Sequence, residues 1–586
     1  MVTELMAPEK PALSRAYYAD TVRSWLWPAT AVLLLAAVLR LAFLLEVPPG
    51  LAQDEVLNAD VAGFIRQGAH ALFFREGYGH EALYHYWSVP FQVLLGDNAL
   101  AIRLPSVALG ILLVALTLRW TRRAFDPIAA LAAGALMAVS WWPIIFSRIG
   151  IRPIMEPVFL LLFAWFWPRR PWLAGLFIGL SLYTYTAARV LFLWPLLLGL
   201  YWFLFRKRLP AEQINLKGRP FPQPMVAAGV VLLVMALLFL PLWLTLRADP
   251  SLQQRVEQLQ GPLLALQSGE LSPALANTLA TAGVFSFTGD PRWTYMIPGQ
   301  PLFNPLTAAL FYGGLLLALW RFKQPAYAFL LFWLLVGMLP SALTPEAPST
   351  IRLVGALPAV YVLPGLAVSW LWQRGSASTV PGWARGALVI LFAAVLLLAA
   401  GRTIIDGFVR WPQALETRLK YQTVLLDMAR YLRQGQEGTP VFADGFYRPI
   451  TVDALRRDLN QDLRGRWVQS GAEVAGAVVL PVEGDGRLYV PEFAAPDEML
   501  LAAAGVAAEP LYRSAERPSF AVYALPSAEA LPRLQEAVPF EGNLSLVGYE
   551  ITTPQIGQAI QIVTVWQVEG ALPDVLAVFV NWLDDV

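Results

Sequence analysis

The sequence contains no cysteine, so disulfide bonds, thiolate metal ligands and cysteine nucleophiles are excluded. Charged residues are also scarce: they make up 15% of the chain, against about 25% in a typical soluble domain. Hydrophobic residues make up 57% of the chain. A soluble protein with so many apolar residues could not cover them with its polar surface. The formal net charge of +1 offers no electrostatic basis for binding nucleic acid. The composition therefore predicts a membrane protein.

Long apolar runs recur along the chain, and a spanning helix needs about 20 mostly apolar residues. Eleven runs are predicted to span the membrane, near 25–45, 100–118, 128–146, 154–167, 172–186, 190–205, 225–246, 305–320, 326–343, 353–372 and 386–402. Basic residues fall in every second loop, and lysine and arginine favour the cytoplasmic side. With a cytoplasmic N-terminus, eleven spans place the chain after residue 403 on the extracytoplasmic side.

The expected fold class is a polytopic α-helical membrane protein with a C-terminal extracytoplasmic part. Residues 1–24 are the expected cytoplasmic N-terminus, and 25–403 the transmembrane domain, whose outer loop 46–99 is long. Helix and strand patterns over 404–535 predict an extracytoplasmic α/β domain. Residues 536–586 alternate like strands of a β-sandwich, and the sequence ends inside that pattern. The expected sandwich is therefore partial, either truncated or incomplete.

The outer loop 46–99 concentrates side chains that can take part in chemistry. Asp54 and Glu55 lie side by side within ten residues of the first predicted span. A carboxylate at that depth can occupy a cleft of low polarity and keep access to water, so its basicity can be tuned. The loop also holds every histidine of the protein: His70, His80 and His85. Polar loops also contain histidine without any functional role, and that alternative stays open.

Five arginines lie where the preference of basic residues for the cytoplasmic side disfavours them, at the outer ends of predicted spans. They are Arg103, Arg148, Arg152, Arg189 and Arg352. A buried arginine costs at least about 2.5–3.5 kcal/mol on insertion scales. Any one of them could extend to the lipid headgroups, but a shared anion-binding cavity explains the set better. Because arginine binds phosphate through two parallel hydrogen bonds, we expect the anion to be a lipid phosphate.

Carboxylates and arginines at headgroup depth suit glycosyl transfer from a lipid-phosphate sugar. A base takes the proton of the acceptor hydroxyl, while cations stabilise the charge on the departing phosphate. A membrane transporter or flippase of lipid-linked or anionic substrates is the alternative, although that class spreads its charges over several spans. A non-catalytic scaffold would leave both sets of side chains unexplained.

Several segments resemble one family, and they occur in the expected order. They read GHEALYHYW, AIRLPSVALG, SRIGIRPIMEP, LSLYTYTAARVLFLWPLL and GDPRWTYMIPGQPLFNPLT. Over about residues 20–400 the chain is similar to the protein O-mannosyltransferase and aminoarabinose-transferase superfamily, membrane glycosyltransferases of the C-type fold whose bacterial branch includes lipopolysaccharide-type enzymes. The resemblance implies a bacterial plasma-membrane enzyme, a polyprenyl-phosphate-linked sugar donor and inversion at the anomeric carbon. Membrane lipid is an expected partner, and lipid, glycan and protein acceptors all fit.

The resemblance also assigns residues. Asp54 is the candidate general base and Glu55 its support, while four of the arginines, Arg148, Arg152, Arg189 and Arg352, would face the donor phosphate. His80, Glu81 and Tyr84 fall where relatives hold the donor or acceptor. Outside the resemblance, His85 and Asp290 complete the expected substrate-binding residues. Relatives have proline or lysine where this chain has Ala82, so the phosphate contact of that lysine would come from an arginine or a metal.

A divalent metal is the one cofactor that the sequence leaves open. Asp54, His80 and Glu81 offer oxygen and imidazole ligands, but no tight metal-binding motif is present. Asp290 belongs to the turn-rich segment 287–306, which could close over substrate or simply connect two spans.

Overall fold

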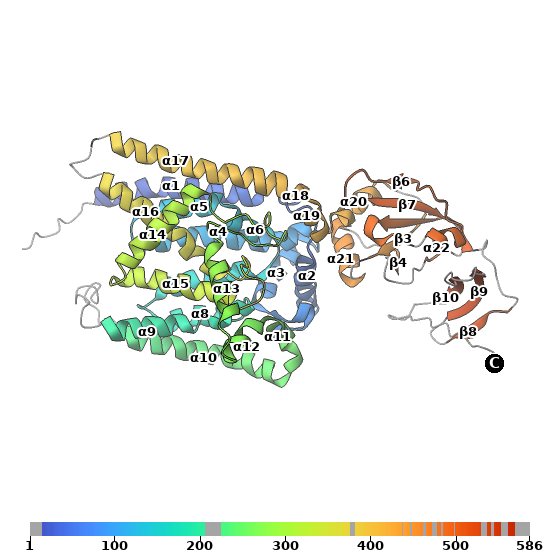
Figure 1. Cartoon of the computed structure of the whole chain (residues 1–586), viewed down its shortest axis with the longest axis horizontal. Helices are drawn as coiled ribbons and strands as arrows, with labels where there is room; N and C mark the ends of the chain where they lie inside the picture. The colour runs from blue at the N-terminus through green and yellow to red at the C-terminus, as the bar shows by residue number, and fades with distance from the viewer. Residues whose placement is uncertain are drawn as a thin grey trace, which may run out of the picture. The chain divides into compact units, whose positions relative to one another are not determined.

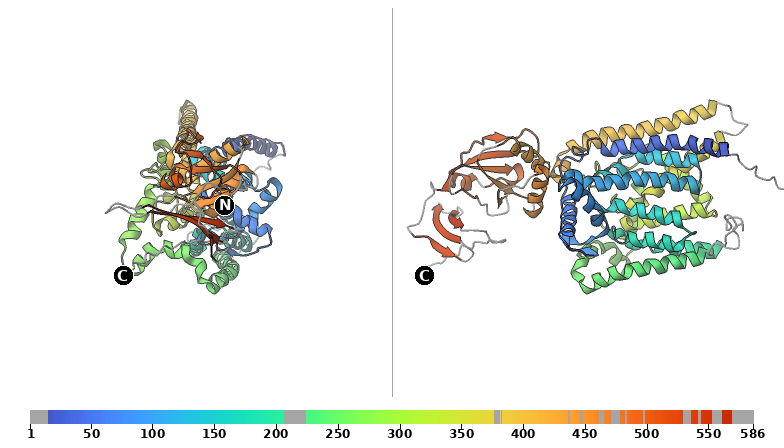
Figure 2. Two further views of the ribbon diagram at one scale, coloured as in Figure 1. Left: turned by 90° about the vertical axis from the view of Figure 1, so that its right-hand side faces the viewer. Right: turned by 180° about the vertical axis from the view of Figure 1, so that it is seen from behind.

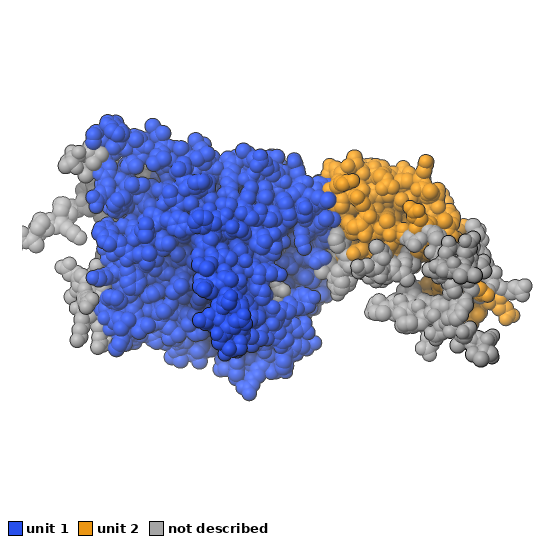
Figure 3. All heavy atoms as spheres, viewed as in Figure 1, with its two compact units in different colours: residues 1–422 blue, residues 423–586 orange. Residues whose placement is uncertain are grey.

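The computed structural model describes residues 15–205, 224–375, 381, 383–435, 438–445, 448–460, 465–470, 478–481, 484–496, 498–528, 536–540, 544–552 and 561–568. The chain divides into two compact units, Met1–Gln422 and Thr423–Val586, coloured blue and orange in Figure 3. The first unit is helical, and the second combines strands with helices (Figure 1). The start of the predicted N-terminal segment and the end of the predicted sandwich, 1–14 and 569–586, lie outside the described residues.

The first unit is built on twelve helices that carry the apolar runs. They are α1 (Arg15–Leu41), α4 (Ala99–Ala124), α5 (Pro127–Val139), α6 (Trp141–Arg148), α7 (Met155–Phe166), α8 (Pro171–Ser181), α9 (Leu193–Phe205), α10 (Pro224–Ala248), α14 (Pro305–Trp320), α15 (Pro325–Ala342), α16 (Leu357–Gly375) and α17 (Trp383–Arg402). Each of the eleven predicted apolar ranges overlaps one of these helices, except that 128–146 corresponds to the pair α5 and α6. α1 begins at Arg15, inside the segment expected to be cytoplasmic.

Among the described residues, six helices are long and apolar enough to cross a membrane, or seven if α5 and α6 form one span. These two helices bend by 59° at Ser140, whose backbone is extended. Pro143 lies in the first turn of α6 and has no N–H to continue a helical ladder from α5. Several other apolar helices are shorter than a full span, so the count of eleven spans stays a prediction.

The predicted outer loop 46–99 is folded. It forms α2 (Gln53–Arg66), β1 (Phe73–Phe74), η1 (Glu76–Tyr78), β2 (His80–Glu81) and α3 (Leu83–Leu95). β1 and β2 pair antiparallel, and α2 packs against α3 across one end of the helix bundle (Figures 1 and 2). Gly77 lies between the two strands with φ +57°, and a Cβ there would lie 2.8 Å from His80 Nε2. A side chain at this position would therefore displace His80.

The remaining elements of the first unit are short. The segment between α10 and α14 contains η5 (Pro250–Gln253), α11 (Gln254–Leu259), α12 (Gly261–Gln267) and α13 (Ser272–Gly283). Three further 3₁₀ turns are η2 (Arg152–Ile154), η3 (Thr186–Val190) and η6 (Val354–Ala356). After α17 the chain continues as the π-helix η7 (Thr403–Arg410), α18 (Trp411–Gln413) and α19 (Leu415–Lys420).

Small residues allow the central helices to approach closely. A Cβ on Gly314 of α14 would lie 1.8 Å from the carbonyl oxygen of Leu363 in α16. A Cβ on Gly365, on α16, would lie 2.4 Å from the carbonyl oxygen of Ala129 in α5. Such contacts between backbones are how membrane helices gain packing energy where burial in lipid supplies none. α16 is consequently held on two sides, by α14 and by α5.

The second unit contains two separate sheets. The first combines α20 (Thr423–Leu432), β3 (Thr439–Asp444), α21 (Arg448–Leu459), β4 (Arg466–Gln469), β5 (Gly486–Pro491), η8 (Glu492–Ala494), α22 (Glu498–Ala503), β6 (Tyr512–Arg513) and β7 (Phe520–Leu525). Its strand order is β4-β3-β5-β7-β6, with β3 parallel to β4 and β5, and β7 antiparallel to both of its neighbours. The second sheet is antiparallel, in the order β10-β9-β8, with β8 (Val538–Phe540), β9 (Leu544–Thr552) and β10 (Gln561–Val568).

The boundary between the units follows Gln422, later than the predicted boundary at 403. The reason is that the segment after α17 packs on the first unit. Trp411 Nε1 donates to the carbonyl of Trp293 (2.7 Å), and the Tyr421 hydroxyl donates to the carbonyl of Thr294 (2.8 Å). Both aromatic residues are fully buried.

Candidate active site

The first turn of α2 places one carboxylate at the surface and the next in the interior. Asp54 is exposed, whereas Glu55 is fully buried. Glu55 Oε1 accepts from Arg103 Nε (3.1 Å) and from the backbone N–H of Gly150 (3.0 Å). Glu55 Oε2 accepts from the backbone N–H of Ala52 (3.0 Å), which closes the N-terminus of the helix. Glu55 therefore fixes where α2 begins, and with it the position of Asp54.

Arg103 and Arg148 are engaged by protein acceptors, and a contact between either of them and a lipid phosphate stays a prediction. Both are fully buried. Besides its pairing with Glu55, Arg103 donates to three carbonyls between residues 44 and 50. Arg148 donates to four carbonyls between residues 39 and 47. The last carbonyls of a helix have no partner inside it, and Arg148 donates to two of those of α1, Leu39 and Arg40. The other acceptors of the two arginines belong to the turns that follow α1.

Glu81 gathers two of the predicted arginines. Arg152 Nη1, from η2, lies 2.7 Å from Glu81 Oε2, and Arg189 Nη2, from η3, lies 3.4 Å from Glu81 Oε1. The Thr186 hydroxyl donates to Glu81 Oε1 (2.7 Å). The glutamate is fully buried, but the two arginine side chains keep 13% and 22% of their surface exposed. The arginines can therefore meet a ligand without breaking the cluster.

Arg189 also lines a pocket of about 290 Å³ at the end of α10. The other lining residues are Phe239, Trp243, Leu246, Arg247, Pro250 and Gln253. The guanidinium of Arg247 lies over the ring of Trp243, 5.1 Å from its centre. The pocket thus combines an apolar wall with two cations, which is the chemistry that an isoprenoid chain ending in a phosphate requires.

The buried histidines form a stack behind this cluster. The rings of His80 and His85 are 5.5 Å apart and nearly parallel. His85 Nδ1 lies 3.3 Å from the carbonyl oxygen of Asn58 in α2. Burial, and secondarily the charge of Arg152, lower the pKa of His85 well below its ordinary value. His85 therefore contacts α2 at Asn58, about one helical turn after Asp54, and it interacts electrostatically with Arg152.

Two predicted substrate-binding residues are inaccessible. His85 is fully buried, and Tyr84 keeps 1% of its surface. The Tyr84 hydroxyl shares a hydrogen bond of 2.7 Å with the hydroxyl of Ser106 in α4, and burial raises its pKa. Both residues hold α3 in place. The α2–α3 packing covers both side chains, and their contact with substrate stays a prediction.

Asp290 is likewise saturated by protein donors. Its carboxylate accepts two hydrogen bonds from Arg292 (2.9 and 3.0 Å) and two from Thr350, through the backbone N–H and the hydroxyl (both 2.7 Å). Asp290 is fully buried and ties the segment 284–304 to Thr350, four residues before η6. Its contact with substrate stays a prediction. Arg352 is almost buried and donates to the Thr344 hydroxyl (2.9 Å).

Asp54 faces the segment that Asp290 anchors. Burial first, and then the Asp54 carboxylate, hold the pKa of the Tyr295 hydroxyl well above its ordinary value. Tyr185, which precedes the η3 turn that carries Arg189, also interacts electrostatically with Tyr295. The Tyr295 carbonyl accepts from Trp141 Nε1 (2.9 Å). Tyr295 therefore interacts electrostatically both with α2 and with the residue that precedes η3.

No three histidine, aspartate or glutamate side chains of the described residues come together as metal ligands. Asp54, His80 and Glu81, the set considered from sequence, are therefore not grouped as a metal site. The carboxylate of Glu81 is instead engaged by two arginines.

Sequence reasoning missed Arg247, Thr186 and Tyr295. Arg247 directly follows the predicted span 225–246, so the same test that selected the other outer arginines would have selected it. Thr186 and Tyr295 carry no comparable signal, because a hydroxyl within a turn is ordinary.

No family model and no curated protein matches the chain. Solved structures do align with it. ArnT from Cupriavidus metallidurans bound to undecaprenyl phosphate aligns with 14% identity and a TM-score of 0.47, over 88% of this chain and 100% of that one. The oligosaccharyltransferase of Archaeoglobus fulgidus in the apo form aligns with 15% identity and a TM-score of 0.46, over 74% of this chain and 64% of that one.

Proposed function

We propose that this chain is a membrane glycosyltransferase that moves a sugar from a polyprenyl-phosphate donor to an acceptor hydroxyl, with inversion at the anomeric carbon. In this proposal it lies in a bacterial plasma membrane with a cytoplasmic N-terminus, and the site faces the extracytoplasmic side. The observation that carries the proposal is the pair of partly exposed arginines, Arg152 and Arg189, held by Glu81 beside an apolar pocket.

The donor phosphate would bind between Arg152 and Arg189. Glu81 neutralises one of the two positive charges, and Arg247 adds another at the pocket wall. The excess positive charge favours an anion, and partial burial strengthens the attraction because little water screens it. Phe239 and Trp243 would receive the start of the prenyl chain.

Asp54 would act as the general base. It takes the proton of the acceptor hydroxyl as the oxygen attacks the anomeric carbon and forms the new C–O bond. The bond between that carbon and the phosphate oxygen breaks, and its electron pair leaves on the polyprenyl phosphate. Arg152 and Arg189 stabilise that negative charge as it develops. Asp54 is suited to the proton transfer because it is exposed while its neighbour Glu55 is locked in an ion pair.

The test is transfer and binding with purified full-length protein in liposomes, given a radiolabelled polyprenyl-phosphate sugar and a mixture of lipid and peptide acceptors. We expect Arg152→Ala and Arg189→Ala to lose donor binding and transfer together. Arg66→Ala, an exposed arginine on α2, is the matched control and should retain both. Donor movement between leaflets without any transfer would support the flippase alternative, and unchanged binding in both variants would remove the phosphate site from the proposal.

A further inference from the structure

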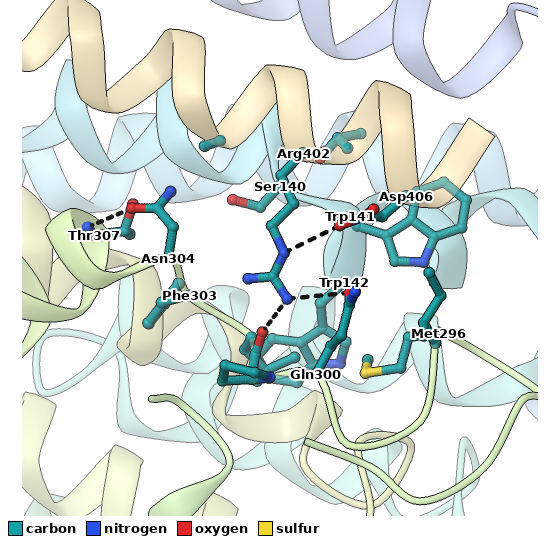
Figure 4. A pocket seen from close by; sticks show the side chains of 15 residues that line it. Ser140, Trp141, Trp142, Met296, Gln300, Phe303, Asn304, Thr307, Arg402 and Asp406 are labelled. Carbon is teal, nitrogen blue, oxygen red and sulfur yellow. Dashed lines mark hydrogen bonds and ion pairs between the residues drawn. The ribbon is translucent and has the colours of Figure 1, made fainter. Parts of the chain in front are cut away.

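A second pocket of the first unit shares no lining residue with the pocket beside Arg189. Its volume is about 40 Å³, and it lies where α5 breaks into α6, against the N-terminus of α14 and the junction of α17 with η7. A water molecule occupies at least about 10–15 Å³ on this measure, so the space fits a phosphate or carboxylate group and excludes a hexose. Figure 4 shows Arg402 projecting from the end of α17 into the middle of the pocket.

The pocket is rich in hydrogen-bond donors. Arg402 Nη2 donates to the carbonyl of Pro301 (2.6 Å) and to Gln300 Oε1 (3.3 Å), which fixes the guanidinium in place. Within the described part of the chain, Arg402 Nη1 has no protein acceptor. Trp142 keeps 2% of its surface, and its Nε1 has no acceptor among the described residues. A buried donor without an acceptor is destabilising, and a bound oxygen would remove that cost.

The charge and the backbone also favour an anion. Asp406 is the acidic partner here, and it is shared by Arg402 (3.7 Å) and by Arg410 (3.0 Å), so one positive charge remains in excess. The 16-residue helix α14 begins at the pocket wall, where Asn304 Oδ1 caps it by accepting from the N–H of Thr307 (3.0 Å). The positive end of a helix dipole attracts negative charge.

The flank of the pocket explains how a lipid would enter. Of the six described helices that are long enough to span a membrane, α17 with the turns after it is the least buried, with 17% of its most hydrophobic window inside the protein. Large apolar side chains on both sides of Arg402 are exposed: Leu397, Leu398, Ile404 and Ile405. An acyl chain can lie along this surface while the headgroup reaches Arg402.

We propose that this pocket binds the phosphate headgroup of an anionic membrane lipid distinct from the sugar donor. The bound lipid holds the segment 296–304 against α17. Tyr295 directly precedes that segment, and its carbonyl accepts from Trp141, which lines the pocket. Because Tyr295 interacts electrostatically with Asp54, occupancy of the pocket positions one wall of the proposed active site. The lipid is a positioning ligand in this scheme and takes no part in the reaction.

The test uses the full chain in nanodiscs of phosphatidylcholine, with or without phosphatidylglycerol, and a third sample with inorganic phosphate added to phosphatidylcholine. We expect phosphatidylglycerol to raise the melting temperature and one phosphatidylglycerol to survive in native mass spectra. Inorganic phosphate should do neither. A full shift with inorganic phosphate would overturn the lipid assignment, and no shift with either probe would overturn the site.

Two variants separate binding from folding. Arg402→Gln removes the charge and keeps a donor for Pro301, and we expect at least about tenfold weaker lipid retention. Trp142→Phe keeps the ring and removes only the N–H, with an expected weakening of about fivefold. Arg66→Gln is the matched control and should behave like the parent protein. If both pocket variants retain lipid as the parent does, the assignment to this pocket is wrong.

Discussion

Glu55 and Arg103 form an ion pair that is almost completely removed from solvent, with Nε 3.1 Å from Oε1 and side-chain exposures of 0% and 1%. The carboxylate one residue earlier, Asp54, is exposed. One of these neighbouring acidic residues is therefore buried and the other exposed. Mutation of Glu55 should lower the stability of the fold, whereas mutation of Asp54 should lower the rate of transfer.

Removing one partner of the buried pair should destabilise the fold. Glu55→Ala leaves the Arg103 guanidinium buried without its counter-charge, and we expect the free energy of unfolding to fall by about 3–5 kcal/mol. Denaturant unfolding in detergent measures this change. Asp54→Ala, at the surface, should stay within about 0.5 kcal/mol of the parent protein. Equal losses for the two variants would contradict the structural role given to Glu55.

Removing the proposed base should affect chemistry and spare binding. We expect Asp54→Asn to lower the transfer rate by about 10²–10⁴-fold, the usual contribution of general base catalysis. Donor affinity, measured by equilibrium binding of the labelled lipid, should not change. Near-normal turnover of Asp54→Asn would remove Asp54 from the mechanism.

The arginines should divide into two classes. Arg189→Ala loses a charged hydrogen-bond donor at the proposed phosphate site, so donor affinity should fall by about tenfold or more. Arg148→Ala removes the guanidinium that donates to four carbonyls in and just after the last turn of α1, so it should lower the melting temperature. The affinity of the protein that remains folded should be unchanged. Loss of affinity in folded Arg148→Ala would restore that residue to the phosphate site.

Acid should destabilise the protein through His85. Burial and the Arg152 charge lower its pKa in the folded state, whereas the unfolded chain titrates near about 6.5. Below that pH the unfolded state binds the extra proton, so stability is lost as the pH falls, by up to about 1.4 kcal/mol per pH unit. We expect the melting temperature of His85→Gln to depend less on pH between 7.5 and 5 than that of the parent. His70→Gln, at an exposed position, should keep the parental pH dependence.

The helices could be predicted from the sequence because apolar runs of span length are a local signal. The partners of the charged residues could not. An arginine at the outer end of an apolar span must have a partner that offsets the cost of burying its charge. The sequence does not show whether that partner is a ligand or a backbone carbonyl. Arg148 and Arg152 are four residues apart, yet one satisfies the end of α1 and the other reaches Glu81. Asp290 was selected as a polar residue in a turn-rich segment, and its saturation by Arg292 and Thr350 depends on contacts as distant as 60 residues in sequence.

The carbonyls at the end of α1 depend on a donor that is synthesised much later. Leu39 and Arg148 are 109 residues apart in sequence. Until residue 148 has been synthesised, no guanidinium from α6 can donate to those carbonyls. The observed end of α1 therefore cannot be completed before α6 has been made.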